Sequence, residues 1–261
     1  MTTITFLGTG AAMPARSYNA CFALDMPGLR LLVDAGGGNE ILRYLDRADI
    51  ATESIHDFFI THTHTDHILG AVWVVRKIIA NAMSGSYAGQ LNVYGNADVI
   101  AAVDTICRLT FLKSYYDYGR KTINYVETGE GVTDIGGYSF DFFDVGSENV
   151  KQTGFRVGSL AFLGDEGLTE RNLDKVSGSA WLICGAFCRY ADREIFKPYE
   201  KHHNTVLDIA RLATDGNIGN LILFHSEDRD IDNRQKLYAD EGAGIFGGRI
   251  IVPRDLETIN I

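Results

Sequence analysis

The sequence predicts a mixed α/β protein of the α+β type. Its 261 residues are 46% hydrophobic and 22% charged, which is an ordinary balance for a globular chain. Short apolar runs of strand length are mixed with longer segments of helical period, without the strict strand–helix alternation of βαβ folds. No segment rich in proline or serine divides the chain, so one domain over residues 1–261 is expected.

The predicted strands are short apolar runs bounded by glycine or polar residues. They cover Ile4–Leu7, Cys21–Leu24, Leu29–Val33, Asp57–Ile60, Leu91–Tyr94, Thr122–Glu127, Tyr138–Val145, Gly154–Val157, Leu160–Leu163, Trp181–Cys184, Leu221–Phe224 and Arg249–Val252. The predicted helices carry an apolar stripe at helical spacing. They cover Glu40–Leu45, Ile68–Met83, Ala97–Leu109 and Thr205–Thr214. Residues 61–67 are polar and are predicted to form a loop.

Charge and cysteine content restrict the class of protein. With 24 Lys and Arg against 34 Asp and Glu, the net charge of −10 does not favour nucleic-acid binding through the overall field. No apolar run approaches the roughly 20 residues of a membrane-spanning helix. No secretory leader is visible, and the four cysteines lack zinc-finger spacing. We therefore expect a cytoplasmic protein with reduced thiols and no membrane association.

Three histidines and a carboxylate fall within six positions, directly after a predicted buried strand. They are His62, His64, Asp66 and His67. Imidazole nitrogens and carboxylate oxygens are ligands suited to zinc, manganese or iron. Two adjacent pairs indicate two metals rather than one. A merely histidine-rich polar loop is the alternative, and chance seldom produces this spacing.

The H-x-H-x-D-H motif after an apolar strand resembles the metallo-β-lactamase-fold metallohydrolases. Other segments resemble the ribonuclease Z and phosphodiesterase branch of that superfamily. These are LGTGAAMP with Asn19, LLVDAGGG, Gly164-Asp165 after LAFL, His203-Asn204-Thr205, and His225 after LILF. The resemblance covers essentially the whole chain, and it implies a four-layer αββα sandwich with metals at its edge.

The resemblance also implies a ligand set. His62 and His64 would hold the first metal, whereas Asp66, His67 and His225 would hold the second, with Asp165 bridging both. Asp165 and His225 each follow an apolar strand, where side chains project from a sheet edge. Alone, Asp165 reads equally as a turn residue and His225 as a cap or a buried structural histidine. Asp34, in the turn after a strand, is expected to support the metal loop by hydrogen bonding.

Two positions depart from the family pattern. A third histidine is expected about twenty residues before Asp165, where Gly146 stands instead. Asp144, Ser147 or Glu148 are candidates to replace it, and Glu148 has the better reach. The ribonuclease Z branch also carries a glutamate where this chain has Gly185. In that branch the glutamate orients the histidine that matches His203 as a proton donor. The alternative for His203 is an exposed helix start capped by Asn204.

These observations predict a metal-dependent hydrolase, most consistent with a phosphodiesterase that uses one or two zinc, manganese or iron ions. Asp66 would orient and deprotonate the attacking water, and His203 would bind phosphate or protonate the leaving group. Only nineteen positions separate Gly146 from Asp165, which leaves no room for a tRNA-binding arm. A small or short phosphodiester is the expected substrate, nucleic acid is disfavoured, and a homodimer is open. A hydrolase of lactones, thioesters or β-lactams and a degenerate metal-binding member remain the alternatives.

Overall fold

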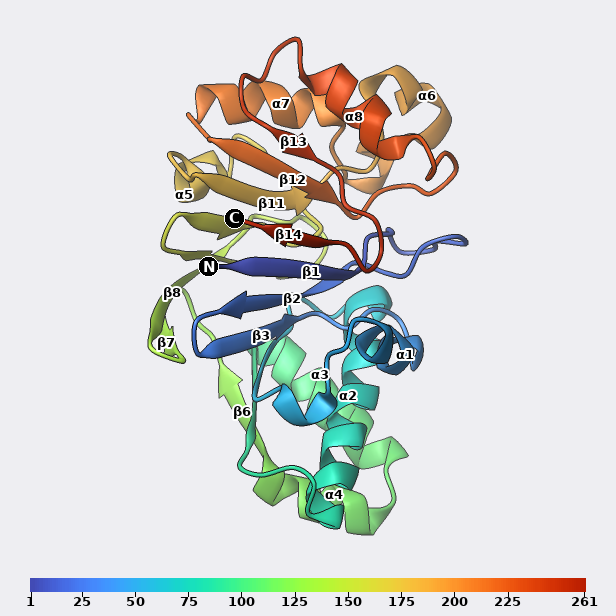
Figure 1. Ribbon diagram of the computed structural model, residues 1–261, viewed down its shortest axis with the longest axis vertical. Helices are drawn as coiled ribbons and strands as arrows, with labels where there is room; N and C mark the ends of the chain where they lie inside the picture. Colours follow the sequence, from blue (N-terminus) through green and yellow to red (C-terminus); the bar gives the residue numbers. More distant parts are fainter. The chain divides into compact units, whose positions relative to one another are not determined.

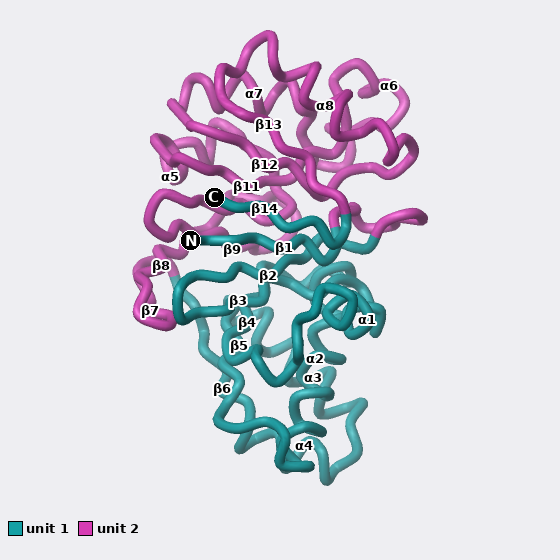
Figure 2. The backbone as a smooth tube through the Cα atoms, in the orientation of Figure 1, with its two compact units in different colours: residues 1–8, 18–129, 255–261 teal, residues 9–17, 130–254 magenta.

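The computed structural model describes residues 1–261, which form two compact units (Figures 1 and 2). Unit 1 contains residues 1–8, 18–129 and 255–261, and unit 2 contains residues 9–17 and 130–254. Each unit is built on a sheet of seven strands. The mixed α/β class predicted from the sequence is confirmed.

The sheet of unit 1 has the order β14-β1-β2-β3-β4-β5-β6. Its strands are β1 (Thr3–Gly8), β2 (Cys21–Met26), β3 (Leu29–Val33), β4 (Asp57–Phe59), β5 (Leu91–Gly95), β6 (Ile123–Glu127) and β14 (Thr258–Asn260). Strands β3 to β6 pair in parallel, whereas β14, β1, β2 and β3 pair antiparallel. The short β4 therefore lies inside the parallel part of the sheet.

The helices of unit 1 pack on its sheet and bury one continuous apolar core. They are α1 (Glu40–Arg47), α2 (Thr65–Ser84), α3 (Ala97–Thr110) and α4 (Lys113–Thr122), with a 3-10 turn η1 at Thr52–Ser54. Val74, Val75 and Ile78 of α2 belong to the same buried cluster as Leu32 of β3 and Phe58 of β4. Burial of this apolar surface holds α2 against the strands that precede the metal motif.

Unit 2 has a second seven-stranded sheet, in the order β13-β12-β11-β10-β9-β8-β7. Its strands are β7 (Gly131–Ile135), β8 (Tyr138–Asp144), β9 (Thr153–Val157), β10 (Leu160–Phe162), β11 (Trp181–Gly185), β12 (Asn220–Phe224) and β13 (Ile250–Ile251). Strands β10 to β13 pair in parallel, and β7 to β10 pair antiparallel. Both units thus combine a parallel half with an antiparallel half.

Helices and short helical turns cover the sheet of unit 2. They are α5 (Leu173–Val176), α6 (Arg193–Phe196), α7 (Val206–Asp215) and α8 (Arg234–Gly242), with η2 (Tyr190–Asp192) and η3 (Tyr199–Lys201). Val206, Ile209 and Ala213 of α7 share a buried cluster with Leu182 and Leu223 of the strands. Thr205 begins α7 with a capping box, so the predicted Asn204 cap is wrong by one residue. The Thr205 hydroxyl and the Asp208 carboxylate satisfy the first backbone groups reciprocally.

Residues 9–17, which carry most of the LGTGAAMP motif, belong to unit 2. The backbone of Ala11 donates to the Ser226 carbonyl at 3.1 Å, and that of Ser226 donates to the Thr9 carbonyl at 3.1 Å. The Asp228 carboxylate accepts from the amides of Ala15 at 2.6 Å and Arg16 at 2.5 Å. The segment is therefore fastened to the loop that follows β12.

Several elements differ from the sequence prediction. Helix α2 begins at Thr65 rather than after residue 67, so Asp66 and His67 lie in its first turn. Helices α4 and α8 and strand β7 were not predicted. Residues 249–252 contain only the two-residue β13, and the final strand is β14, which pairs with β1. Weak amphipathicity in α8 and a glycine-bounded polar strand in β7 explain these omissions.

The four cysteines are free and buried, in agreement with the predicted reduced thiols. Burial raises the pKa of the Cys184 thiol to about 12. No helix in the structure has the length and apolar character that crossing a membrane requires.

Gly70 provides a test of the packing of α2. A Cβ at this position would lie 1.8 Å from the Ala35 carbonyl oxygen. We expect Gly70→Ala to lower the free energy of unfolding by about 1–3 kcal/mol, because backbone must move. Gly38→Ala is the control, because nothing lies within 4 Å of a Cβ there. Urea unfolding checks both variants, and equal stability of the two would contradict the close approach of α2 to residues 35–36.

Candidate functional site

The H-x-H-x-D-H motif lies at the carboxyl end of a parallel strand in unit 1. Strand β4 ends at Phe59, and the chain passes through Thr61–His64 into α2. His64 is the residue before the helix, while Asp66 and His67 occupy its first turn. The carboxyl ends of parallel strands are where α/β folds collect functional side chains. The change from strand to helix within six residues brings all four predicted ligands to one place.

The side chains of the motif lie close together. The ring centroids of His62 and His64 are 4.6 Å apart, and those of His62 and His67 are 4.2 Å apart. Nε2 of His67 lies 3.3 Å from Oδ2 of Asp66. Tetrahedral zinc with bonds near 2.0–2.1 Å holds its ligand atoms roughly 3.3 Å apart. Asp66 and His67 therefore have the separation of two ligands of one metal, and His62 and His67 each belong to a group of residues that could hold an ion.

The Asp34 carboxylate orients this cluster. It accepts hydrogen bonds from the Thr61 amide at 2.8 Å, from the Thr61 hydroxyl at 2.8 Å, and from Nδ1 of His67 at 2.8 Å. Because the Thr61 hydroxyl donates to Asp34, its oxygen accepts from Nδ1 of His62, which lies 2.9 Å away. In the neutral form of each ring the lone pair then lies on Nε2, which is the form that binds metals. The supporting role predicted for Asp34 is confirmed for His67.

The charges around His67 favour its cationic form. Burial lowers the pKa of this imidazole, but the carboxylates of Asp34 and Asp66 outweigh burial and hold the pKa well above its usual value. The environment therefore attracts positive charge, which is what a cation-binding cluster requires.

Asp165 and His225 come together within unit 2. Asp165 follows β10 and His225 follows β12, again at the carboxyl ends of parallel strands. Nε2 of His225 lies 3.7 Å from Oδ2 of Asp165, and both residues are buried. His225 has a positive φ of 51°, a conformation that costs a non-glycine residue roughly 1–3 kcal/mol. The strand end is thus held in a strained shape that directs this imidazole towards Asp165.

Two residues near Asp165 were not found from the sequence. Nε2 of Gln152 donates to Oδ1 of Asp165, and Gln152 is buried. Burial, together with the neighbouring Asp165 carboxylate, raises the pKa of Glu166 to about 7, although a hydrogen bond with Ser147 acts to lower it. No sequence pattern marked either residue, because their roles come from proximity to Asp165.

Gly146 stands where the resemblance implies a third histidine. Its φ of 78° lies in the left-handed region. The Gly146 amide donates to Oδ1 of Asp144 at 2.8 Å. Glu148, the preferred replacement, forms ion pairs with Arg171 at 2.7 Å and with Nδ1 of His202 at 3.3 Å. The Arg171 guanidinium lowers the pKa of Glu148. Glu148 therefore already contacts two basic side chains in this structure, and its role as a ligand stays a prediction.

Gly185, which stands where the resemblance implies a glutamate, packs closely against the Asp165 backbone. A Cβ here would lie 1.9 Å from the Asp165 carbonyl oxygen and 2.6 Å from the Asp165 carbonyl carbon. The Gly185 amide donates to the Glu166 carbonyl at 3.1 Å, which draws the two strands' ends together. No side chain fits at residue 185 unless the backbone after β10 moves.

His203 lies next to His225 in unit 2, with ring centroids 5.2 Å apart. Its ring stacks on Phe187 at 5.1 Å and an interplanar angle of 21°. The His203 amide donates to the Pro198 carbonyl at 2.9 Å. His203 is thus oriented by an aromatic ring and by its backbone in place of the missing carboxylate. The neighbouring residue, Asn204, donates to the Leu168 carbonyl at 3.1 Å.

Comparisons with known proteins agree with this geometry. The family model described as "Anti-Pycsar protein Apyc1" matches residues 2–87. Ribonuclease Z of Methanococcus aeolicus is 31% identical over 109 residues, which are 41% of this chain and 32% of that protein. The metallo-β-lactamase fold protein YhfI of Bacillus subtilis superposes with a TM-score of 0.79 at 16% identity, covering 99% of this chain and 98% of YhfI.

The chain has the metallo-β-lactamase fold. A diphosphatase of the PhnP family superposes equally completely, with a TM-score of 0.77 at 18% identity, covering 100% of this chain and 98% of that one. The predicted fold class and the resemblance to the ribonuclease Z and phosphodiesterase branch of the superfamily are confirmed. The chain spans about a third of the length of the first curated relatives that it matches.

Within this metallo-β-lactamase fold, the Asp34 carboxylate can be tested by Asp34→Asn. The substitution keeps the shape but replaces one acceptor oxygen with a donor, so His67 and Thr61 lose a charged partner. We expect metal affinity to fall roughly 10- to 100-fold. Competition with a fluorescent zinc chelator measures it.

The control for that experiment is Asp57→Asn. Asp57 lies on β4, the strand before the histidine motif, and accepts from Asn92 at 3.0 Å and from Tyr94 at 2.9 Å. Its metal affinity should equal that of the natural chain. An unchanged affinity in Asp34→Asn would mean that Asp34 supports folding alone.

Proposed function

We propose that this protein is a metal-dependent hydrolase that cleaves a small phosphodiester. The observation that carries the proposal is the cluster of His62, His64, Asp66 and His67, in which Asp34 orients His67 and Asp66 lies 3.3 Å from Nε2 of that ring. The fold and the ribonuclease Z and diphosphatase names among its relatives support phosphoester chemistry.

The proposed ligands follow the family resemblance. By that resemblance the ligands are His62, His64, Asp66, His67, Asp165 and His225, and the single domain over residues 1–261 expected from the sequence is proposed with them. The nitrogen and oxygen donors suit zinc, with manganese or iron as alternatives, at one or two ions per chain. Gly146 leaves the first site with fewer protein ligands than the second.

When bound, the metal lowers the pKa of a bound water and stabilises charge on the transferring oxygens. The residues of this chain supply the remaining steps. Asp66 orients the water and accepts its proton. A hydrogen bond to Asp34 orients His67, and a hydrogen bond from Gln152 orients Asp165. His203, fixed against Phe187, donates a proton to the departing alcohol.

The proposed substrate is small. The net charge of −10 opposes a long polyanion, and the stretch between Gly146 and Asp165 has no insertion that could serve as a tRNA-binding arm. The cytoplasmic location expected from the sequence stays a prediction, and a homodimer stays open.

A second candidate function is ligand binding without turnover. The glycines at residues 146 and 185 favour it, because both stand where the family resemblance implies functional side chains. The backbone around Gly185 excludes the expected glutamate outright, so a simple restoration at that position is not a usable test. Activity measurements with defined metal content separate this candidate from the hydrolase.

Metal removal tests the proposal. We expect protein treated with a chelator to lose hydrolysis of bis-p-nitrophenyl phosphate and to regain it with zinc or manganese. Asp66→Asn should lower kcat by about 100-fold or more, because it removes the proton acceptor. Asp117→Asn is the control, an exposed carboxylate paired with Lys113.

Plasma mass spectrometry gives the metal content per chain in the same samples. Cleavage of acyl esters without cleavage of the phosphodiester would favour the lactone, thioester or β-lactam alternative. Bound metal with no turnover of either substrate would favour the ligand-binding candidate.

Proton donation by His203 can be separated from positioning with two leaving groups. His203→Gln should reduce kcat strongly for a phosphodiester with an aliphatic alcohol leaving group, by roughly 100-fold. The p-nitrophenyl substrate should lose far less, because nitrophenolate departs without a proton. His202→Gln is the control. Equal losses on both substrates would assign His203 to positioning.

A further inference from the structure

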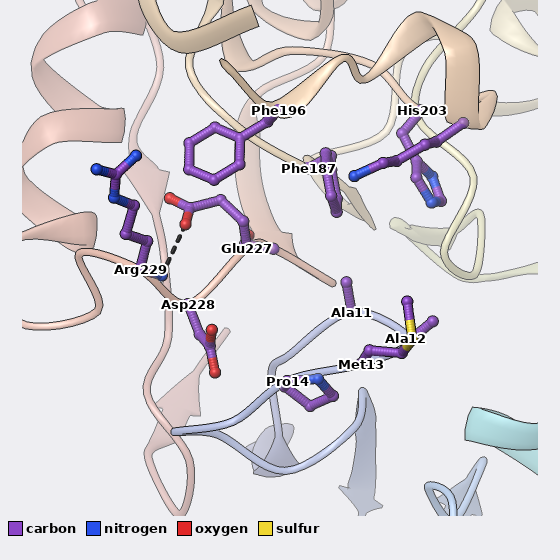
Figure 3. Close-up of a pocket in the computed structure, with 12 residues that line it drawn as sticks. Ala11, Ala12, Met13, Pro14, Phe187, Phe196, His203, Glu227, Asp228 and Arg229 are labelled. Atoms are coloured by element: carbon purple, nitrogen blue, oxygen red, sulfur yellow. Dashed lines mark hydrogen bonds between the residues drawn. The ribbon is translucent and has the colours of Figure 1, made fainter.

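Unit 1 contains a groove of about 600 Å³ that none of the steps proposed above uses. It is distinct from the cavity of about 370 Å³ in unit 2 (Figure 3). His203 lines that cavity together with Phe187 and Phe196, so the cavity belongs with the chemistry already proposed. Helices α3 and α4 and strand β6 supply the residues that line the groove of unit 1.

Strand β6 has an open edge. It is the last strand of the sheet of unit 1 and pairs with β5 alone (Figure 1). The amide of Thr128, directly after β6, donates to the Gly95 carbonyl of β5 at 2.8 Å. Because main-chain groups alternate between the two edges of a strand, those of Tyr125 and Glu127 face away from β5. The open edge therefore offers the donors and acceptors of two residues to a further strand.

A ladder of polar side chains crosses the sheet and ends at this edge. Nδ2 of Asn92 on β5 donates to Oδ1 of Asp57 on β4 at 3.0 Å, and Nδ2 of Asn124 on β6 donates to Oδ1 of Asn92 at 2.9 Å. The three residues are register partners on adjacent parallel strands. Each amide thus donates to the preceding strand, so the exposed Asn124 places the last acceptor of the ladder at the open edge.

The opposite face of β6 borders the groove. Ile123, Tyr125 and Glu127 alternate along the strand, and all three line the groove. Helix α3 contributes Ala97 and Ala101, which are exposed and too small to fill it. A strand added to β6 would place every second side chain over this space. Main-chain pairing next to pockets for alternate side chains is the arrangement by which sheet edges bind extended peptides.

Charged residues mark the two ends of the groove. Glu127 is exposed and pairs in register with Gly95, two positions before α3 begins. Asp104 lies about two turns further along α3, and its Oδ1 accepts from the Tyr116 hydroxyl at 3.0 Å. Arg120, one turn after Tyr116 on α4, supplies an exposed cation at that end. The groove therefore has a carboxylate near the end of β6 and a guanidinium near its start.

We infer that the groove binds an extended segment of another protein, which adds to β6 as a further, parallel strand. Its main chain pairs with Tyr125 and Glu127. Its alternate side chains are acidic beside Arg120, small and apolar over Ala101, and basic beside Glu127, and a polar amide continues the ladder from Asn124.

The ladder favours this occupant over a second copy of the chain. A copy related by a two-fold axis would pair β6 with β6 antiparallel, which does not continue the parallel register of Asp57, Asn92 and Asn124. The inference is independent of the proposed hydrolase, because none of the proposed ligands lines the groove.

Amide hydrogen exchange of the full chain, followed by NMR, tests the inference. The probe is the blocked peptide acetyl-TENVTKT-amide at millimolar concentration, which carries the required side chains in parallel register. We expect the Tyr125 and Glu127 amides to exchange about tenfold more slowly with the peptide, because they become hydrogen-bonded. The Thr128 amide, already bonded to Gly95, is the internal control and should not change. The peptide TELVTKT, which lacks the ladder amide, should bind more weakly.

Variants of the groove separate this site from other binding. Ala101→Trp fills the groove and should abolish the slowed exchange. Thr105→Trp is the matched control, an exposed position on the same helix outside the groove. Glu127→Pro is a second blocking variant, because it removes an outward donor while the bonds to β5 remain.

Two results would overturn the inference. One is unchanged exchange at Tyr125 and Glu127 with the peptide TENVTKT present, or slowing that survives Ala101→Trp. The other is slowing that appears without peptide and grows with protein concentration, which would identify a second copy of the chain as the strand added to β6.

Discussion

The Asp34 carboxylate is the constraint on which the metal cluster of unit 1 depends. It joins the end of β3 to the end of β4 through Thr61, and to the first turn of α2 through His67. A buried carboxylate is costly unless donors compensate for lost water, and Asp34 takes its donors from the segments that must be aligned. The same hydrogen bonds that keep this charge buried therefore fix the tautomers of two histidines. The interactions that stabilise the folded segments around Asp34 are therefore the same ones that orient the histidines.

In both units a polar residue with a positive φ directly follows a strand. Asp34 directly follows β3 with φ of 54°, and His225 directly follows β12 with φ of 51°. Such conformations cost non-glycine residues roughly 1–3 kcal/mol each. Nearby hydrogen bonds offset the cost: the Asp34 amide donates to the Phe59 carbonyl at 2.9 Å, and the Ser226 hydroxyl donates to the Ala186 carbonyl at 2.7 Å. In each unit a strand is turned sharply at its carboxyl end, which lets a polar side chain face the residues that follow neighbouring strands.

The sequence predicted most of the sheet strands and the H-x-H-x-D-H cluster, because apolar runs and dense ligand spacing are local signals. It did not predict the start of α2 at Thr65, since a polar first turn resembles a loop until tertiary packing holds it. Gln152 was missed because its importance comes from contact with Asp165, which lies 13 positions further along the chain. Glu166 was missed because its raised pKa comes mainly from burial, which depends on the fold. Likewise Gly185 looked like a simple loss, whereas the close approach of Asp165 shows a backbone that excludes any side chain. Local sequence patterns predict helices and strands, whereas contacts between separate segments become visible only in the folded structure.

The metal motif of unit 1 and the cavity of unit 2 are built from different parts of the chain. The cluster of unit 1 comes from one short segment supported by one carboxylate, so few substitutions leave it intact. The walls of the cavity in unit 2 come from loops after β1, β11 and β12, each of which tolerates change without altering the sheet. Gly185 is also explained by local packing, because the hydrogen bond from its amide to the Glu166 carbonyl brings the segments after β10 and β11 too close for a side chain there. His203 is instead oriented by stacking on Phe187.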